Sequence, residues 1–259
     1  MPDRPDSLDA PDVPALRAWL DATPGLVHGG RLLACDDPER VGWPEVERLA
    51  RQEGLLALLM TPLDAVERVR ARLGEGWHLH RWSVYVGEGG QVAPICRRIV
   101  AEVNLPEDFA LDAVPGDADD AVFEEIAALD RAAGVSPQPT WYLRGELLPS
   151  LTTVLRDDSG RAIATGSAQA RHHPSGIHAG WIFVGAVAVH PEQRGRGFGR
   201  LMNAFTVQEA LERLPGDTVY EHVAVDNAPS RAMVRRCGLH EDAGRVALAI
   251  SRAATSFTR

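Results

Sequence analysis

The hydrophobic positions of the chain alternate between short continuous runs and amphipathic stretches. Continuous apolar runs bounded by Gly or Pro, such as 54–60 and 182–189, are typical of buried strands. Apolar residues three and four positions apart, as at Leu63, Val66 and Val69, are typical of helices that cover a core. Because the two patterns alternate along the chain, the sequence predicts an α/β protein.

The pattern places elements in both halves of the chain. In the first half it predicts helices at 15–20, 44–51 and 63–73, and strands at 30–35, 54–60 and 77–87, while 91–102 gives mixed signals. In the second half it predicts helices at 121–132, 198–214 and 228–236. It also predicts strands there at 150–157, 161–171, 181–189, 218–225 and 245–251.

The segment 105–120 has two prolines and six acidic residues and is predicted to be a linker. It separates a small N-terminal α/β domain (15–104) from a larger C-terminal domain (121–259). Residues 1–14, rich in Pro and Asp, are predicted to be a disordered tail. Segments 54–85 and 219–250 both run strand, helix, glycine, strand. This repeat allows two hypotheses, a degenerate second copy of the C-terminal unit or an ordinary small α/β domain.

Composition narrows the class of protein. The chain is 45% hydrophobic and has a formal net charge of −9, which argues against a general nucleic-acid binder. Three cysteines, an odd and small number, favour a reducing compartment. No apolar run approaches the ~20 residues that span a membrane, and the N-terminus has no apolar signal segment. We therefore expect a cytoplasmic protein that does not contact membranes.

The segment 187–200 carries the most specific chemical signal. A buried strand ends at Pro191, and three alternating glycines then lead into a helix that begins near Phe198. Glycine lets a ligand approach the backbone, and the first N–H groups of a helix attract anions. Arginines 194, 196 and 200 add positive charge. The segment is predicted to bind phosphate, although a plain turn between strand and helix is the simpler alternative.

The spacing of these residues distinguishes among phosphate-binding motifs. A dinucleotide fingerprint needs a third glycine where Arg200 stands, and a nucleoside-triphosphate loop needs a lysine, which this chain lacks. The pattern R-x-x-G-x-G at Arg194, Gly197 and Gly199, directly after the V-x-V strand at 187–189, resembles the GNAT superfamily of N-acetyltransferases. The resemblance covers the chain from about residue 120 onward.

The resemblance implies a mixed, mostly antiparallel sheet flanked by helices, with acetyl-CoA as the co-substrate and no metal. It implies that the backbone of Val187 and Val189 binds the pantetheine arm. The pyrophosphate would lie on Arg194, Gly195, Arg196, Gly197, Phe198 and Gly199. Asn227 and Ser230 match the family's second cofactor motif, although plain helix capping explains the same two residues.

The resemblance also implies a backbone amide, here that of Val189, as donor to the thioester carbonyl. His222 stands where some relatives carry a catalytic glutamate, and imidazole can take the proton of an amine. The simpler interpretation is a structural histidine on a half-exposed strand. Glu221 and His190 are weaker candidates for the base.

The family often has a tyrosine that protonates the leaving thiolate, but Val234 occupies that position here. Tyr142, Cys237 or water could serve instead. Alternatively, no acid is needed, since a thiol of pKa ~8.5 leaves tolerably well, or the protein is a weak catalyst. The side chains of Trp141, Tyr142, His172 and His173 are candidates to line the acceptor pocket.

These features predict an enzyme that moves an acetyl group from acetyl-CoA to a primary amine by direct attack, acting as a monomer or homodimer on a small molecule or peptide. Two alternatives stay open. One is a CoA-binding regulatory or structural protein with little turnover. The other has the arginine loop bind nucleic acid.

Overall fold

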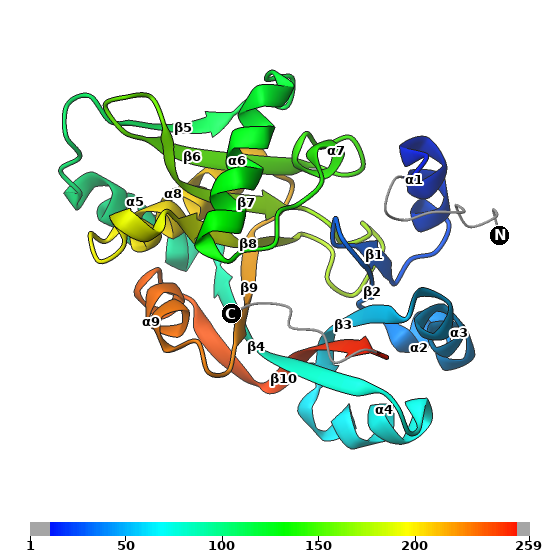
Figure 1. Cartoon of the computed structure of the whole chain (residues 1–259). Helices are drawn as coiled ribbons and strands as arrows, with labels where there is room; N and C mark the ends of the chain where they lie inside the picture. Colours follow the sequence, from blue (N-terminus) through cyan, green and yellow to red (C-terminus); the bar gives the residue numbers. More distant parts are fainter. Residues whose placement is uncertain (1–10, 253–259) are drawn as a thin grey trace.

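The computed structural model describes residues 11–252. In this part of the chain, strands form one sheet in the order β1-β2-β3-β10-β4-β9-β8-β7-β6-β5, and helices flank it (Figure 1). The paired strands are antiparallel except β2 with β3 and β8 with β9. The predicted α/β class, with a mixed and mostly antiparallel sheet, is thus confirmed.

The sheet draws on both halves of the chain. The strands are β1 (Leu26–His28), β2 (Leu33–Cys35), β3 (Leu55–Pro62), β4 (His78–Glu88), β5 (Ala110–Val114), β6 (Ser150–Arg156), β7 (Ala162–Gln169), β8 (Trp181–Val189), β9 (Thr218–Ala224) and β10 (His240–Ser251).

The helices lie before or between these strands along the chain, singly or in pairs. They are α1 (Val13–Asp21), α2 (Pro38–Val41), α3 (Trp43–Glu53), α4 (Val66–Leu73), α5 (Gly89–Glu102), α6 (Asp120–Ala133), α7 (Thr140–Leu143), α8 (Phe198–Arg213) and α9 (Ala228–Arg236), with short 3-10 turns at Leu63–Ala65 and Pro191–Gln193.

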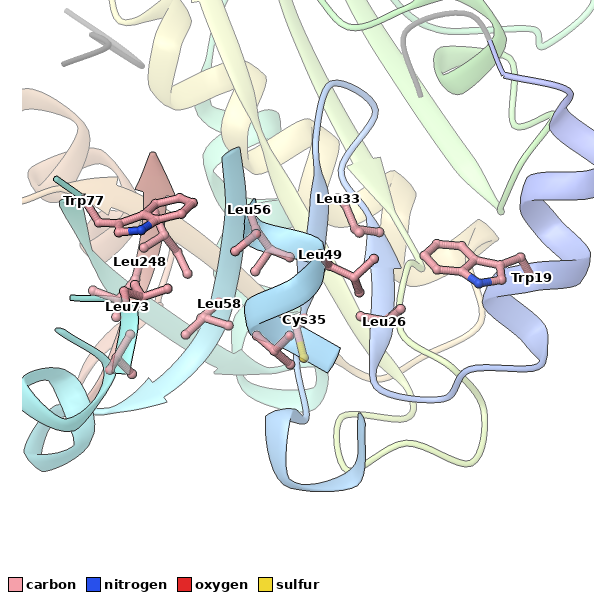
Figure 2. Close-up of a cluster of buried hydrophobic side chains, with 14 of the residues drawn as sticks. Trp19, Leu26, Leu33, Cys35, Leu49, Leu56, Leu58, Leu73, Trp77 and Leu248 are labelled. Carbon is pink, nitrogen blue, oxygen red and sulfur yellow. The ribbon is translucent and has the colours of Figure 1, made fainter. Parts of the chain in front are cut away.

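The N-terminal half has its own hydrophobic core. Leu49 of α3 lies among Leu33 of β2 and Leu56 and Leu58 of β3, and Trp19 of α1 closes one end (Figure 2). All five side chains are at most 2% exposed. The core also takes in Leu248 and Ile250 of the last strand, so it is completed by residues from the other end of the sequence.

The two halves of the sheet are interleaved. The unit β3-α4-β4 and the unit β9-α9-β10 have the same order of elements, as the repeat in the sequence predicts. β10 lies between β3 and β4, and β4 lies between β10 and β9. Leu58 of β3 pairs with Leu248, and Trp82 of β4 pairs with Ala224. Each unit therefore places a strand inside the other.

Helices cover both faces of the C-terminal strands. Thr165 of β7 points to Asp130 of α6, and the neighbouring Gly166 lies against Thr206 of α8. Because successive residues of a strand point to opposite faces, α6 and α8 lie on opposite sides of the sheet. Figure 1 shows α6 crossing β6, β7 and β8.

The face that carries α6 is also covered, farther along, by the N-terminal half. Leu59 of β3 and Val27 of β1 belong to the same apolar cluster as Phe183 of β8 and Tyr220 of β9. The sheet therefore curls so that its first strands pack against β8 and β9. This packing brings residues of the first 60 positions beside the end of the sheet described below as the candidate site.

Some elements differ from the expectation. The stretch 105–120, predicted as a linker, contains β5, which pairs with β6. The ambiguous 91–102 forms most of α5, whose single internal proline, Pro94, lies near its start. Of the tail predicted at 1–14, residues 1–10 lie outside the described part, and α1 already begins at Val13. The last strand begins at His240 rather than 245, and a register shift between Glu241 and Val246 hides its first residues in the sequence pattern.

Candidate functional site

The candidate site lies where β8 and β9 separate. These strands pair in parallel only at Trp181–Phe183 with Thr218–Tyr220. Beyond that point β8 continues to pair with β7 up to Val189, while β9 continues to pair with β4 up to Ala224. The two strands diverge, and the backbone groups on their facing edges lose their ladder partners. Such an opening can accept an extended ligand between the strands.

The backbone of Val189 points into this opening. Val189 stands opposite Ala164 of β7, and the adjacent ladder bond runs from the His190 N–H to the Ile163 carbonyl at 2.9 Å. That bond makes Val189 and Ala164 a pair without mutual hydrogen bonds. The N–H and C=O of Val189 therefore face away from β7, toward the side from which β9 has departed.

A β-bulge marks the point of divergence. The register of β8 on β7 shifts between Thr165 and Ser167, and Ala186 takes φ 50°. A left-handed conformation at a residue other than glycine is strained, and such strain concentrates at functional sites. The bulge turns the segment from Val187 to Val189 relative to the first part of the strand.

The glycine loop follows directly. Gly195 and Gly197 have φ 78° and 85°, which glycine adopts without strain, and Gly197 is the N-cap of α8. A Cβ at either position would meet no heavy atom within 4 Å. The loop is therefore open, with the free N–H groups of a 16-residue helix behind it. These residues fit a phosphate group held by backbone and helix dipole.

Three arginines of the loop are placed differently. Arg194 donates to the carbonyl of Ala133 at the end of α6, at 2.8 Å. Arg196 stacks on the ring of Phe198, with 4.8 Å between its guanidinium carbon and the ring centre. Arg194 thus ties the loop to α6, and exposed Arg196 and Arg200 are the cations available to a bound anion.

Asn227 and Ser230 act as a helix cap. The Asn227 side chain accepts a hydrogen bond from the Ser230 N–H at 3.1 Å, which starts α9. Neither side chain is fully exposed or fully buried. The capping interpretation thus describes their contacts here, and contact with a cofactor stays a prediction.

His222 lies on β9 at the edge of the opening. Its ring is 5.5 Å from that of Phe183 and 5.3 Å from that of Tyr220. Burial lowers the pKa of His222 well below 6.5. Its Nε2 is shielded from water and has no hydrogen-bond partner among the described residues. A neutral imidazole with an unused nitrogen can accept a proton.

The other titratable candidates lie elsewhere. Glu221 points to the opposite face, accepts from Asn203 at 2.8 Å, and burial raises its pKa to about 8. His190 is 3.7 Å from Glu192 at the strand end. Asp130, which the sequence analysis did not single out, is buried on the same face as His222. Burial raises its pKa to about 6, and it accepts from Thr165 at 3.0 Å.

Val234, at the position of the missing tyrosine, and the two side chains that could replace it as the acid are all buried. Val234 is 0% exposed, within the core beneath α9. Tyr142 donates to the His28 carbonyl at 3.0 Å, in the interface between the two halves, and Trp141 packs beside it. Cys237 lies next to Cys96 of α5. The structure brings none of these groups together with His222.

A buried hydrogen-bond chain connects the two halves next to His222. Asp36 Oδ2 bonds His172 Nδ1 at 2.5 Å, His172 Nε2 bonds the Tyr220 hydroxyl at 2.7 Å, and that hydroxyl accepts from Arg171 Nε at 2.7 Å. Burial lowers the pKa of His172 and raises that of Tyr220. The Arg171 guanidinium stacks on Phe183 at 3.9 Å.

A cavity of about 690 Å³ opens beside this chain. Its wall comes from α1 and β1 on one side and from segments 145–149, 170–181 and 215–216 on the other. His172 and His173, predicted to line an acceptor pocket, contribute to this wall, whereas Trp141 and Tyr142 do not.

Sequence reasoning did not find Asp36, Arg171 or Tyr220 as functional candidates. Asp36 and His172 are 136 positions apart, and Tyr220 reads as an ordinary strand residue. Only the pairing of the halves brings them together. The weak signal available was the polar run Arg171-His172-His173 at the end of a predicted strand.

The described residues meet neither the requirements of a metal site nor those of a membrane-spanning helix. Among residues 11–252, no group of three or more His, Cys, Asp or Glu side chains is arranged to bind a metal ion. In the same range, none of the helices combines the length and apolarity required to cross a bilayer.

Residues 121–239 match the sequence model of the acetyltransferase (GNAT) family. This match, together with the split strands and the glycine loop, identifies this part of the chain as a GNAT acetyltransferase domain. The fold family generally uses acetyl-CoA. No curated protein matches the sequence.

Solved structures share the fold at low sequence identity. A tandem GNAT protein from the clavulanic acid biosynthesis pathway, solved without AcCoA, is 17% identical with a TM-score of 0.57. The match covers 97% of this chain and 91% of that one. A GCN5-related N-acetyltransferase from Kribbella flavida is 18% identical, with a TM-score of 0.54 and coverage of 84% and 76%. A GCN5-related N-acetyltransferase-like protein from Streptococcus suis is 12% identical, with a TM-score of 0.52 and coverage of 96% and 86%. A tandem neighbour that covers nearly the whole chain fits the two interleaved units.

Proposed function

We propose that the protein transfers an acetyl group from acetyl-CoA to a primary amine of a small molecule or peptide by direct attack. The observation that carries the proposal is the opening between β8 and β9, which leads to the glycine loop at the start of α8. An extended thioester ligand with a pyrophosphate needs both features, a strand edge and an anion site, in this order along the chain.

The chain's own groups have defined tasks in this reaction. Bound acetyl-CoA would supply the thioester, so that a C–N bond forms, the C–S bond breaks and CoA thiol leaves. The Val189 N–H, which faces the opening, would donate to the carbonyl oxygen as negative charge develops there. The edges of Val187 and Val189 would hold the pantetheine amides, and the loop 194–199 the pyrophosphate.

The amine must lose a proton before it attacks. An alkylamine of pKa ~10 is protonated at pH 7, and removing that proton costs about 4 to 5 kcal/mol. His222 Nε2 is our proposed proton acceptor, because it is neutral, lacks a partner and lies at the divergence point. The proton then passes to solvent or to the departing thiolate.

A second candidate function is a CoA-binding regulatory protein with little turnover. It is favoured by Val234, which is fully buried where the family often places a tyrosine and cannot donate a proton. Substituting tyrosine there would overpack a filled core and cost ~1–3 kcal/mol, so that variant is a poor test. A measurement of turnover distinguishes the transferase from the regulatory protein.

Calorimetric titration with acetyl-CoA tests the site. We expect about micromolar binding to the wild type and at least about a hundred-fold loss in Gly197→Glu, whose side chain would enter the anion site. Gly160→Glu is the matched control, because Gly160 has φ 79° and open space like Gly197 but lies in the β6–β7 turn. Equal loss in both variants, or no wild-type binding, would refute the site.

Turnover is measured by CoA release with a panel of primary amines. Release that depends on the amine supports the transferase. Tight acetyl-CoA binding with no release for any amine class would support the regulatory candidate instead.

A further inference from the structure

The cavity of about 690 Å³ lies on the seam between the two halves of the protein. Arg17 and Leu20 of α1 and Val27 of β1 form one wall, and Arg171 and Trp181 contribute to the other. Its volume falls in the range of small-molecule pockets. Because both halves supply its wall, neither half alone has the cavity.

Arg171 is the unusual group in this wall. Its Nε donates to Tyr220 and its plane stacks on Phe183, but its Nη2 is shielded from water with no hydrogen-bond partner. Arg171 makes no ion pair with a carboxylate within residues 11–252. The guanidinium is partly buried and has no anionic partner among the described residues, so it favours an anion from outside the protein.

The carboxylates near Arg171 in the described part of the chain do not neutralise its charge. Asp36 is bound to His172 rather than to Arg171. Asp21, the carboxylate in the cavity lining, is exposed on α1. Arg17, also in the lining, donates to the Glu146 backbone carbonyl and leaves its charge uncompensated by a described carboxylate. The charged side chains of the lining therefore favour an anion, and the leucines and Trp181 around them favour an apolar body.

The side chain of Tyr220 connects the inner wall of the cavity to His222, the proposed proton acceptor. Arg171 and Trp181 both contact Tyr220, at 2.7 Å by the hydrogen bond and 5.8 Å between rings. Tyr220 is in turn 5.3 Å from His222. Arg171 and His222 flank the same ring of Phe183. A molecule bound at Arg171 thus lies on the face of the sheet that His222 serves.

We propose that this cavity binds a small carboxylate with an apolar body, and that Arg171 takes the carboxylate. Its role as the acceptor's site rests on the proposed acetyl transfer, and the acceptor would then be an amino-acid-like primary amine that carries a carboxylate. A guanidinium binds a carboxylate by charge-assisted hydrogen bonds. The binding step itself requires neither acetyl-CoA nor turnover.

The test is an NMR titration of the full chain with 3-phenylpropionate and with the uncharged 3-phenylpropionamide, without acetyl-CoA. Neither probe has an amine that can be acetylated, so the result is independent of the proposed transfer. We expect saturable binding of the carboxylate and about ten-fold or weaker binding of the amide. Arg171→Gln should weaken carboxylate binding by about the same factor. Arg97→Gln, an exposed arginine on α5, should leave it unchanged.

A second variant guards against loss of structure in Arg171→Gln. Ala179 lines the cavity at an exposed position, so Ala179→Phe should occupy part of the cavity and weaken binding while the fold is kept. The melting temperature of each variant is measured alongside. No wild-type saturation, equal binding of acid and amide, or full binding in Ala179→Phe would each overturn the proposal.

Discussion

Asp36 and His172 form a hydrogen bond of 2.5 Å between Oδ2 and Nδ1, and both side chains are 1% exposed. The chain beyond them fixes the proton positions. Arg171 Nε donates to the Tyr220 hydroxyl, which then donates to His172 Nε2 and leaves the proton on Nδ1 to bond Asp36. One loop after β2 and one loop after β7 are thereby joined across the interface of the two halves.

Removing Asp36 should therefore loosen the interface. Asp36→Ala leaves the His172 Nδ1–H buried without an acceptor, which costs about 1–3 kcal/mol of the free energy of unfolding. Urea titration of the full chain measures the loss. Asp64→Ala, an exposed carboxylate beside α4, is the control and should change stability by less than about 0.5 kcal/mol. Equal effects of the two substitutions would show that the interface bond contributes nothing.

Glu221 should make stability depend on pH. Its pKa is raised from 4.5 to about 8 by burial, so between these values the folded state holds a proton that the unfolded state has lost. Stability of the wild type therefore falls as pH rises through this range. Glu221→Gln keeps an acceptor for Asn203 and removes the titration. Its stability relative to the wild type should rise by about 4–5 kcal/mol between pH 4 and pH 9.

Urea unfolding of both proteins at pH 4, 7 and 9 checks this expectation. Parallel stability profiles for the wild type and Glu221→Gln would mean that Glu221 stays ionised in the folded protein. The substitution Glu192→Gln, at an exposed carboxylate, gives the profile expected without a buried acid.

His222 should be required for turnover if it accepts the amine proton. His222→Ala should lower kcat by about 10²–10⁴, while His190→Ala should keep it within about three-fold of the wild type. Because the pKa of His222 lies well below 6.5, protonation of the imidazole should limit kcat/KM only in acid below that value. A rate in His222→Ala equal to that of the wild type would show that His222 is not the proton acceptor. Asp130 would then be the next candidate, and its Asp130→Asn variant is measured in the same series.

The order of strands shows what a sequence can and cannot predict. The strand and helix character of 181–189 and 198–214 follows from continuous apolar runs and 3.6-residue spacing, and both elements are found at nearly those bounds. The neighbours of a strand are not encoded in its own pattern. β4 and β10 pair because of long-range packing, so no local feature of 78–88 indicates that it joins the C-terminal sheet.

The candidate site likewise has one part that the sequence predicts and another part that it does not. The loop from Arg194 to Gly199 is contiguous and its glycines have a local conformational reason, so its anion site could be predicted. Arg171 and Asp36 acquire their roles from partners more than 40 positions away. Apart from the polar run that begins at Arg171, their types and spacing carry no signal, and the side chains meet only because the sheet curls over itself.

The preference of the enzyme for amines that carry a carboxylate should depend on Arg171. If the cavity holds a carboxylate during transfer, kcat/KM for phenylalanine should exceed that for phenethylamine by about ten-fold, because only the amino acid compensates the charge of the partly buried guanidinium. Arg171→Gln should abolish this preference, whereas Arg97→Gln should keep it. CoA release measured with both amines gives the ratio, and a preference for phenethylamine in the wild type would contradict the assignment.

The C-terminal domain should not fold when it is isolated. A fragment of residues 121–259 lacks β4, the partner of β9 and β10, and lacks α5, which packs on α8. We expect it to be aggregated or to lack a cooperative melting transition, as judged by circular dichroism and size-exclusion chromatography. Adding the separately produced 1–120 fragment should restore the transition. A stable, monomeric 121–259 fragment would show that the interleaved strands are dispensable.

The interleaving also sets the order of events during synthesis. β3 and β4 cannot become neighbours of one sheet until β10 fills the gap between them, and β10 ends at Ser251. The ribosome must therefore synthesise the chain as far as β10 while the facing edges of β3 and β4 remain unpaired. Contacts this distant in sequence close slowly, because loop-closure entropy is lost first. The newly synthesised chain thus depends on β10 to cover the edges of β3 and β4, and we expect chaperone dependence to be greatest just before β10 emerges.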